Sequence, residues 1–153
     1  MRVRNHKNGV SLHVIAGTHV VLLCLDADIK SRKGLLGFRL KRKETATNET
    51  TDLKGFKQFK NNAKEEDFDL IQAFFWADYT ALPNTKYQYS AIPVYGTPEN
   101  QKNGEEIEIN ITTENPENGS HGVFFNRGTV GQAYAKKFNN QNPDKVPNNE
   151  AYK

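Results

Sequence analysis

The chain has very little cysteine, with Cys24 the single one among 153 residues. One cysteine cannot form an intrachain disulfide, so a disulfide-bonded immunoglobulin domain is excluded. Cys24 lies in the apolar run 19–25, HVVLLCL, where a small buried hydrophobic side chain is more frequent than a nucleophile. We therefore interpret it as a packing residue of a strand.

Long hydrophobic runs are also missing. No segment approaches the ~20 consecutive apolar residues that a membrane-spanning helix needs. Three basic residues precede the apolar stretch 10–25 and loosely imitate a signal peptide. His13 and His19 interrupt that stretch, however, and the sequence DAD after it makes a poor cleavage site. We expect strands here, no transmembrane segment, and a cytoplasmic protein.

Metal-ligand and phosphate-binding spacings are not found. No two histidines lie at i, i+2 or i, i+4, and no cysteine pair exists to complete a zinc site. His13 and His19 fall on successive expected strands and could approach each other, although ordinary strand histidines are the more frequent outcome. The segment GLLGF lacks the Lys-Ser/Thr that follows a phosphate-binding loop. The sequence therefore predicts no cofactor and no metal.

Charge is present but weakly unbalanced, with a formal net charge of +3 that identifies no partner. Residues 30–43 contain seven basic and no acidic residues: Lys30, Arg32, Lys33, Arg39, Lys41, Arg42 and Lys43. These residues are candidates for an anionic surface that meets the phosphates of lipid or nucleic acid. The interpretation we favour is a solvated strand face with its turns, balanced by acidic residues at 65–69 and 105–108.

Alternation of apolar and polar residues, broken by turn residues, predicts an all-β sandwich of about seven strands. The clearest strand segments are 10–15, 19–25, 34–43, 68–76, 87–92 and 105–113, with a short extended segment at VFFNRG. The polar stretch 44–66 has no pattern and is expected to be a long loop. The strand after Tyr87 should be regular only to about Ile92, because Pro93 cannot donate within a sheet.

The segment 82–95, LPNTKYQYSAIPVY, is the most informative part of the sequence. Tyr87, Tyr89 and Ala91 would share one strand face. Pro83, Thr85 and Tyr87 have the spacing of a tyrosine corner, in which the phenol hydroxyl bonds to upstream main chain and fixes a crossing between two sheets. We therefore expect Tyr87 to be buried at such a corner.

The C-terminal residues differ in character from the sandwich, which we expect to occupy residues 1–113. Val130, Tyr134 and Phe138 are spaced as in an amphipathic helix, which predicts a short helix over 129–138. The extension 114–138 is expected to pack on the sandwich or on a following domain. Residues 139–153 are rich in Asn and Pro and are expected to be a flexible linker or tail.

The segment PNTKYQYSAIPVYGTPEN resembles the end of a fibronectin type III domain. More broadly, the chain resembles the N-terminal region of bacterial phospholipase D-like proteins, through AGTHVVLLCLDAD, KGLLGFRLKR, residues 74–100 and FNRGTVGQAYAKKF. In that family the region precedes a catalytic domain with a His-x-Lys motif and a downstream Asp. The resemblance therefore implies that this chain is the front part of a longer phosphodiesterase, with the catalytic domain as its partner.

This chain is not expected to be an enzyme itself, because none of its four histidines has a lysine two residues later. Its expected role is that of a non-catalytic accessory module for a phospholipase D-like domain outside the chain. The alternative is an independent β-sandwich module that binds a protein or glycan. For glycan binding, Trp76 and Tyr79 are the aromatic residues that we expect to be exposed.

Overall fold

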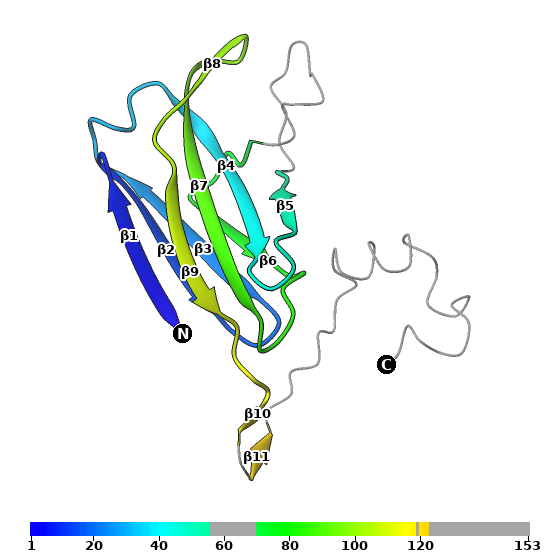
Figure 1. Cartoon of the computed structure of the whole chain (residues 1–153). Coiled ribbons are helices and arrows are strands. Elements are labelled where there is room, and N and C mark those ends of the chain that lie inside the picture. Colours follow the sequence, from blue (N-terminus) through cyan, green and yellow to red (C-terminus); the bar gives the residue numbers. More distant parts are fainter. Residues whose placement is uncertain (56–69, 119, 123–153) are drawn as a thin grey trace, which may run out of the picture. The chain divides into compact units, whose positions relative to one another are not determined.

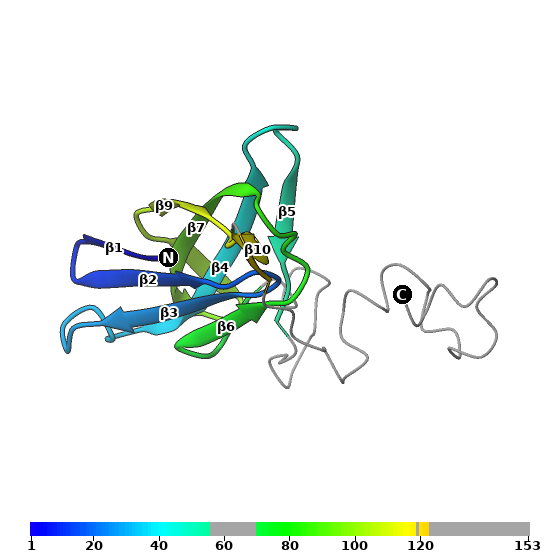
Figure 2. The ribbon, with the colours of Figure 1, turned by 90° about the horizontal axis from the view of Figure 1, so that it is seen from below.

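The computed structural model describes residues 1–55, 70–118 and 120–122. It divides into two compact units, Met1–Glu114 and Asn115–Lys153. The described residues of the first unit form nine strands and no helix. These strands make two antiparallel sheets that lie face to face, which is the expected all-β, sandwich-like arrangement (Figure 1 and Figure 2). The expected number of about seven strands was too low.

The first sheet contains four strands in the order β1-β2-β3-β6. They are β1 (Arg2–Lys7), β2 (Val10–Ala16), β3 (Val21–Ala27) and β6 (Phe75–Asp78). Alternate residues of β2 and β3 are buried against the second sheet, as their apolar patterns predict. They are Val10, Leu12, Val14 and Ala16, followed by Val21, Leu23, Leu25 and Ala27.

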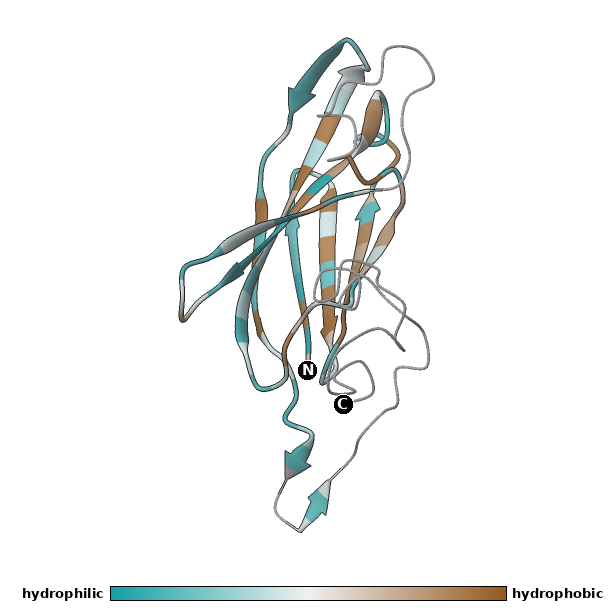
Figure 3. Ribbon diagram, turned by 90° about the vertical axis from the view of Figure 1, so that its right-hand side faces the viewer, coloured by the Kyte–Doolittle hydropathy of each residue, from teal (hydrophilic) through white to brown (hydrophobic). Residues whose placement is uncertain are grey.

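The second sheet is built around its longest strand, β7 (Lys86–Thr97). On one side of β7 lie β4 (Leu35–Glu44) and then β5 (Thr50–Leu53), and on the other lie β8 (Asn100–Asn103) and β9 (Ile107–Thr112). The inward residues again alternate: Phe38 and Leu40 on β4, Tyr87, Tyr89 and Ala91 on β7, and Ile107, Ile109 and Ile111 on β9. These residues of the two sheets belong to one hydrophobic core cluster. Figure 3 shows apolar and polar residues alternating along the strands.

Pro93 does not end β7, contrary to the expectation that this strand is regular only to Ile92. The Phe38 N–H donates to the Ile71 carbonyl at 3.0 Å, and the Phe38 carbonyl accepts the Ile71 N–H at 2.8 Å. Phe38 lies opposite Pro93 in the pairing of β4 with β7, and because its main-chain groups already have partners it needs no hydrogen bond from Pro93. On its other side Pro93 lies where β7 changes partner from β9 to β8, and its carbonyl accepts the Gly104 N–H at 2.7 Å. The missing N–H therefore falls between two partner strands and costs no ladder bond.

Strand β1 was missed because it lies at a sheet edge and has almost no apolar pattern. Its inward-side polar residues extend across to β9: Asn5 Nδ2 donates to the Glu108 carbonyl at 2.9 Å, and Lys7 Nζ to the Glu106 carbonyl at 3.1 Å. These bonds satisfy main-chain acceptors at the edge of the second sheet. At this edge, hydrogen bonds from polar side chains therefore connect the two sheets, as apolar packing connects them in the core.

The stretch 44–66 is not patternless loop throughout, since Thr50–Leu53 forms β5 and Leu53 pairs with Leu40. The expected strand 68–76 is also shifted: β6 begins at Phe75, and Ile71 makes an isolated bridge to Phe38. Residues 100–103, where no strand was expected, form β8, which pairs with the end of β7. Each of these short strands has at most one buried residue, so its sequence lacks the apolar–polar alternation that would have predicted a strand.

The second unit contains a described hairpin of β10 (Glu117–Asn118) and β11 (His121–Gly122). The expected helix 129–138 and the expected tail 139–153 lie outside the described residues, as does the centre of the loop at 56–69. Among the residues that the structure describes, no helix is long and apolar enough to cross a membrane.

Candidate functional site

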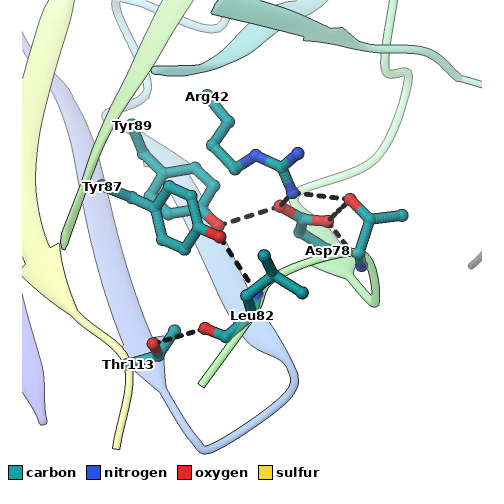
Figure 4. Close-up of polar contacts among 7 residues, drawn as sticks. Arg42, Asp78, Leu82, Tyr87, Tyr89 and Thr113 are labelled. Atoms are coloured by element: carbon teal, nitrogen blue, oxygen red, sulfur yellow. Dashed lines mark hydrogen bonds and ion pairs between the residues drawn. The ribbon is translucent and has the colours of Figure 1, made fainter. Parts of the chain in front are cut away.

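The most connected polar group of the sandwich is the carboxylate of Asp78, at the end of β6 (Figure 4). Its Oδ2 accepts hydrogen bonds from Arg42 Nη1 and from the Tyr89 hydroxyl, each at 2.9 Å. Its Oδ1 accepts from the main-chain N–H of Thr80 at 2.9 Å and from the Thr80 hydroxyl at 2.6 Å. Arg42 Nη1 also donates to the Thr80 hydroxyl at 2.6 Å. Every lone-pair direction of the carboxylate is thus used within the protein.

Strand register brings these residues together from both sheets. Asp78 opposes Val21 on β3, so its side chain points to the core, and Arg42 opposes Tyr89 across β4 and β7 on the inward face. The Arg42 guanidinium lies 5.1 Å from the centre of the Tyr87 ring, within the range of a cation–π contact. The Asp78 side chain is 1% exposed and that of Arg42 is 10% exposed. The network therefore links the two sheets in the interior.

Burial and charge both act on the ionisable groups of this network. Burial raises the pKa of Tyr89, and the adjacent carboxylate of Asp78 raises it further, because a phenolate there would be desolvated and repelled. For Arg42, burial is the largest single effect and would lower the pKa, but attraction to Asp78, Tyr89 and Tyr87 and the hydrogen bond to Asp78 together hold the pKa above its usual value. The stable state is a charged Arg42–Asp78 pair beside a neutral phenol. This pair lies between the two sheets, with little of either side chain exposed.

The turn between β6 and β7 is fixed by a second group of contacts around Tyr87. Tyr87 is buried, and its hydroxyl accepts the main-chain N–H of Leu82 at 3.0 Å. The Leu82 carbonyl accepts the Thr113 hydroxyl at 2.6 Å, and the Thr113 Oγ1 accepts the Thr85 N–H at 2.9 Å. The Thr85 hydroxyl donates to the Pro83 carbonyl at 2.9 Å.

Pro83, Thr85 and Tyr87 are therefore brought together, and Thr113 is a residue that sequence reasoning missed. Thr113 follows β9 and is buried, which places it 28 residues from Thr85 in sequence. A threonine at a strand end carries no signal of its own. Only the pairing of β7 with β9 makes it a neighbour of the turn.

Replacing Tyr87 by Phe should lower the free energy of unfolding by about 1 kcal/mol, because the Leu82 N–H then loses its partner in a partly buried turn. Urea unfolding of the purified variant measures this difference. The matched control is Tyr95→Phe on the same strand, since the Tyr95 hydroxyl makes no hydrogen bond among the described residues. Equal urea midpoints for Tyr87→Phe and the parent chain would contradict the structural role of this hydroxyl.

The seven basic residues of 30–43 do not form one surface. Arg42 points into the core, while Arg39, Lys41 and Lys43 lie on the outward side of β4. Lys30, Arg32 and Lys33 belong to the turn between β3 and β4. Strand pleating thus divides the run, and the solvated face that we favoured does not include Arg42.

Several of these basic residues have partners other than the expected acidic segments. Arg39 donates to Asn103 Oδ1 at 2.6 Å and to Gln101 Oε1 at 2.8 Å, both on β8. Lys41 lies 3.8 Å from Asp52, and Arg32 lies 3.0 Å from Asp26. Residues 65–69 lie outside the described part, and Glu105 pairs with Lys7 at 3.3 Å. Three residues of the basic run, Arg32, Lys41 and Arg42, are thus paired with carboxylates, while Arg39 is held by two neutral amides.

The histidines are also dispersed. His13 on β2 opposes Cys24 on β3, and His19 lies in the turn between these strands. The Nδ1 atoms of His6 and His121 lie within hydrogen-bonding distance of Ser11 and Ser120 hydroxyls, at 2.9 and 3.0 Å. Across residues 1–55, 70–118 and 120–122, no group of three or more His, Cys, Asp or Glu side chains is placed to hold a metal ion.

The exposed aromatic residues are only partly those expected. Tyr79 is 50% exposed, but Trp76 is half-buried against the core. Phe75, which was not among the aromatic residues expected to be exposed, is 66% exposed because it opposes Cys24 on the outer face of the first sheet. Phe74 is 44% exposed, and the Arg32 guanidinium lies 5.5 Å from its ring centre.

The chemistry assembled by the described residues is that of fold stabilisation at Asp78 and Tyr87, together with an outer sheet face that carries Phe75. Comparison of the chain with protein-family models and with curated proteins gives no match.

Proposed function

We propose that the sandwich is a fibronectin type III-like accessory module, and that it supports a phospholipase D-like phosphodiesterase domain lying outside this chain. The observation that carries the fibronectin type III-like part of the proposal is the strand order. In immunoglobulin-like sandwiches, strands A, B and E share one sheet and strands C, F and G share the other. Here β2, β3 and β6 share the first sheet, and β4, β7 and β9 share the second. In this alignment β1 is an added strand, and β5 beside β4 corresponds to C′.

The contact at Tyr87 supports the same assignment. In sandwiches of this kind, a tyrosine near the start of strand F bonds to main chain a few residues upstream. The hydrogen bond from Leu82 to Tyr87, at the start of β7, has this form. Pro83, Thr85 and Tyr87 also have the Pro-x-Thr-x-Tyr spacing of a fibronectin type III domain.

A supporting role, and not a catalytic one, is favoured by the use of the buried polar groups. The carboxylate of Asp78 is paired with Arg42, Tyr89 and Thr80 and is sealed between the sheets. A catalytic carboxylate must contact its substrate, whereas this one holds two sheets together. The phospholipase D-like part of the proposal rests on the sequence resemblance.

The proposal is tested by reading the coding sequence beyond codon 153. A reading frame that continues into a domain with a His-x-Lys motif is the expected result. A stop codon there would contradict the accessory role and favour an independent binding module. The longer protein would then be assayed with and without residues 1–114, where loss of activity or of expression on deletion is expected.

The chain itself should not hydrolyse bis-p-nitrophenyl phosphate, because it lacks the paired histidine and lysine that phosphoryl transfer of this kind uses. Zinc should leave its melting temperature unchanged. The control for contaminating activity is a His13→Ala/His19→Ala variant. Turnover that persists through repurification and disappears in this variant would contradict the prediction, as would a zinc-induced rise in melting temperature that the variant lacks.

A further inference from the structure

The outer face of the first sheet has a distinct composition. Its residues are those that alternate with the buried ones, so they point away from the second sheet. They comprise Arg2, Arg4 and His6 on β1, Ser11, His13 and Ile15 on β2, Leu22, Cys24 and Asp26 on β3, and Phe75 and Ala77 on β6. Apolar residues are thus concentrated on β3 and β6, beside a basic edge on β1.

The four strands lie side by side in the order β1-β2-β3-β6 (Figure 2). Their register arranges these residues in rows across the sheet. One row runs Arg2, Ile15, Leu22, Ala77, and the next runs Arg4, His13, Cys24, Phe75. Each of these two rows begins with an exposed arginine and ends with an apolar residue on β6, whereas the third row, His6, Ser11, Asp26, is polar. Phe75, 66% exposed, is the most prominent of the apolar residues, and Ile15, Leu22, Cys24 and Ala77 are half-buried around it.

We propose that this face is the interface of a homodimer, in which a second copy of the chain packs on it about a two-fold axis parallel to the strands. Such an axis places β1 of one copy over β6 of the other, and β2 over β3. Each row of one copy then lies over the same row of the other copy, with its first residue facing the last residue of that row. Arg4 faces Phe75 of the second copy, Ile15 faces Leu22, and His13 faces Cys24.

This arrangement has the self-complementarity that a two-fold interface requires, since each contact occurs twice. Arginine over an aromatic ring is an attractive cation–π pair, and Ile15 over Leu22 buries apolar surface on both copies. A two-fold axis perpendicular to the strands would instead place β1 over β1 and bring arginines together. The charge distribution therefore selects the parallel axis.

The outer face of the second sheet does not have this character. One of its rows runs Asp52, Lys41, Ser90, Glu108, in which three of the four residues are charged. Lys41 and Asp52 pair with each other at 3.8 Å. Desolvating such a row on association would cost free energy that its pairs do not fully recover. The first sheet is consequently the face that a second copy would cover.

Sedimentation velocity of the full chain over a range of concentrations tests the dimer. The parent chain should show a monomer–dimer equilibrium, and Phe75→Arg should weaken it by about 100-fold or more, because a second positive charge then faces Arg4 at two symmetric contacts. Ile29→Arg is the matched control, since Ile29 is 89% exposed in the turn after β3, outside this face. A parent chain that stays monomeric up to ~0.5 mM would overturn the proposal.

Phe75 also lies on an edge strand, so dimerisation through the face of the sheet must be distinguished from strand pairing along the edge of β6. Arg4→Glu, at the opposite side of the sheet, should weaken the proposed dimer by about tenfold but leave edge-to-edge pairing unchanged. Lys43→Glu makes the same charge change on the second sheet and should have no effect. Combining Arg4→Glu with Phe75→Arg should restore dimerisation, because the two new charges attract across the interface. An Arg4→Glu variant that dimerises like the parent chain would overturn the proposed face.

Discussion

Asp78→Ala is expected to lower the free energy of unfolding by about 3–5 kcal/mol, because it breaks a buried ion pair and leaves one charge behind. That charge is the Arg42 guanidinium, whose side chain is 10% exposed and which loses its counter-ion. The substitution also removes the acceptor of the Tyr89 hydroxyl and of the Thr80 N–H. The cost comes mainly from desolvating an unpaired charge, and the lost hydrogen bonds add to it.

Urea unfolding followed by circular dichroism measures this difference. Asp52→Ala is the matched control: its carboxylate is 59% exposed and lies 3.8 Å from Lys41, so its loss should change stability by less than about 1 kcal/mol. If Asp78→Ala does not fold, the double variant Asp78→Ala/Arg42→Met still tests the argument. Removing both charges should recover much of the lost stability, because no buried charge is left unpaired. A double variant less stable than Asp78→Ala would contradict this account.

The apolar core of this fold follows from the sequence because it has period two. Leu12 and Val14, Leu23 and Leu25, and Ile107, Ile109 and Ile111 alternate with residues of the opposite face, and the structure buries them. The spacing of Pro83, Thr85 and Tyr87 also led us to expect a buried Tyr87, and Tyr87 is buried. Such local patterns were sufficient to predict an all-β sandwich.

Edge strands were not predicted because side chains at an edge need not be apolar. β1 pairs with β2 over its whole length but carries mostly polar residues. A local signal was nevertheless present in the dipeptide Asn8–Gly9, where both residues have positive φ, 45° and 76°. Asn-Gly between two strands is the strongest short hairpin signal, because both positions adopt the left-handed region.

The polar network was not predicted because its members are distant in sequence. Arg42 and Asp78 are 36 residues apart, and each looks like an ordinary surface charge in its own segment. Arg42 stands in a basic run and so looks like a surface charge, although strand alternation places it on the inward face with Phe38 and Leu40. Only the register of β4 with β7, and of β6 with β3, shows that both charges enter the same interior.

The second large effect is expected at alkaline pH. An unfolded tyrosine ionises with a pKa of about 10. In the folded protein, burial and the carboxylate of Asp78 raise the pKa of Tyr89 far above that value. Above pH ~10 the unfolded chain therefore releases a proton that the native protein retains at Tyr89. Unfolding is then favoured as pH rises, and the contribution of Tyr89 is full below pH 10 and declines above it.

The expected slope from this one residue is about 1.4 kcal/mol per pH unit, or about 2 kcal/mol between pH 10 and pH 11.5. Urea unfolding at a series of alkaline pH values measures it, with Tyr89→Phe as the reference. The Phe variant is less stable at neutral pH, because Asp78 loses a donor, so the comparison is between slopes. Difference absorbance of tyrosinate gives an independent reading: Tyr89 should ionise only when the protein unfolds. Parallel pH dependences for the two proteins would show that Tyr89 ionises in the folded state and that the network admits a second negative charge.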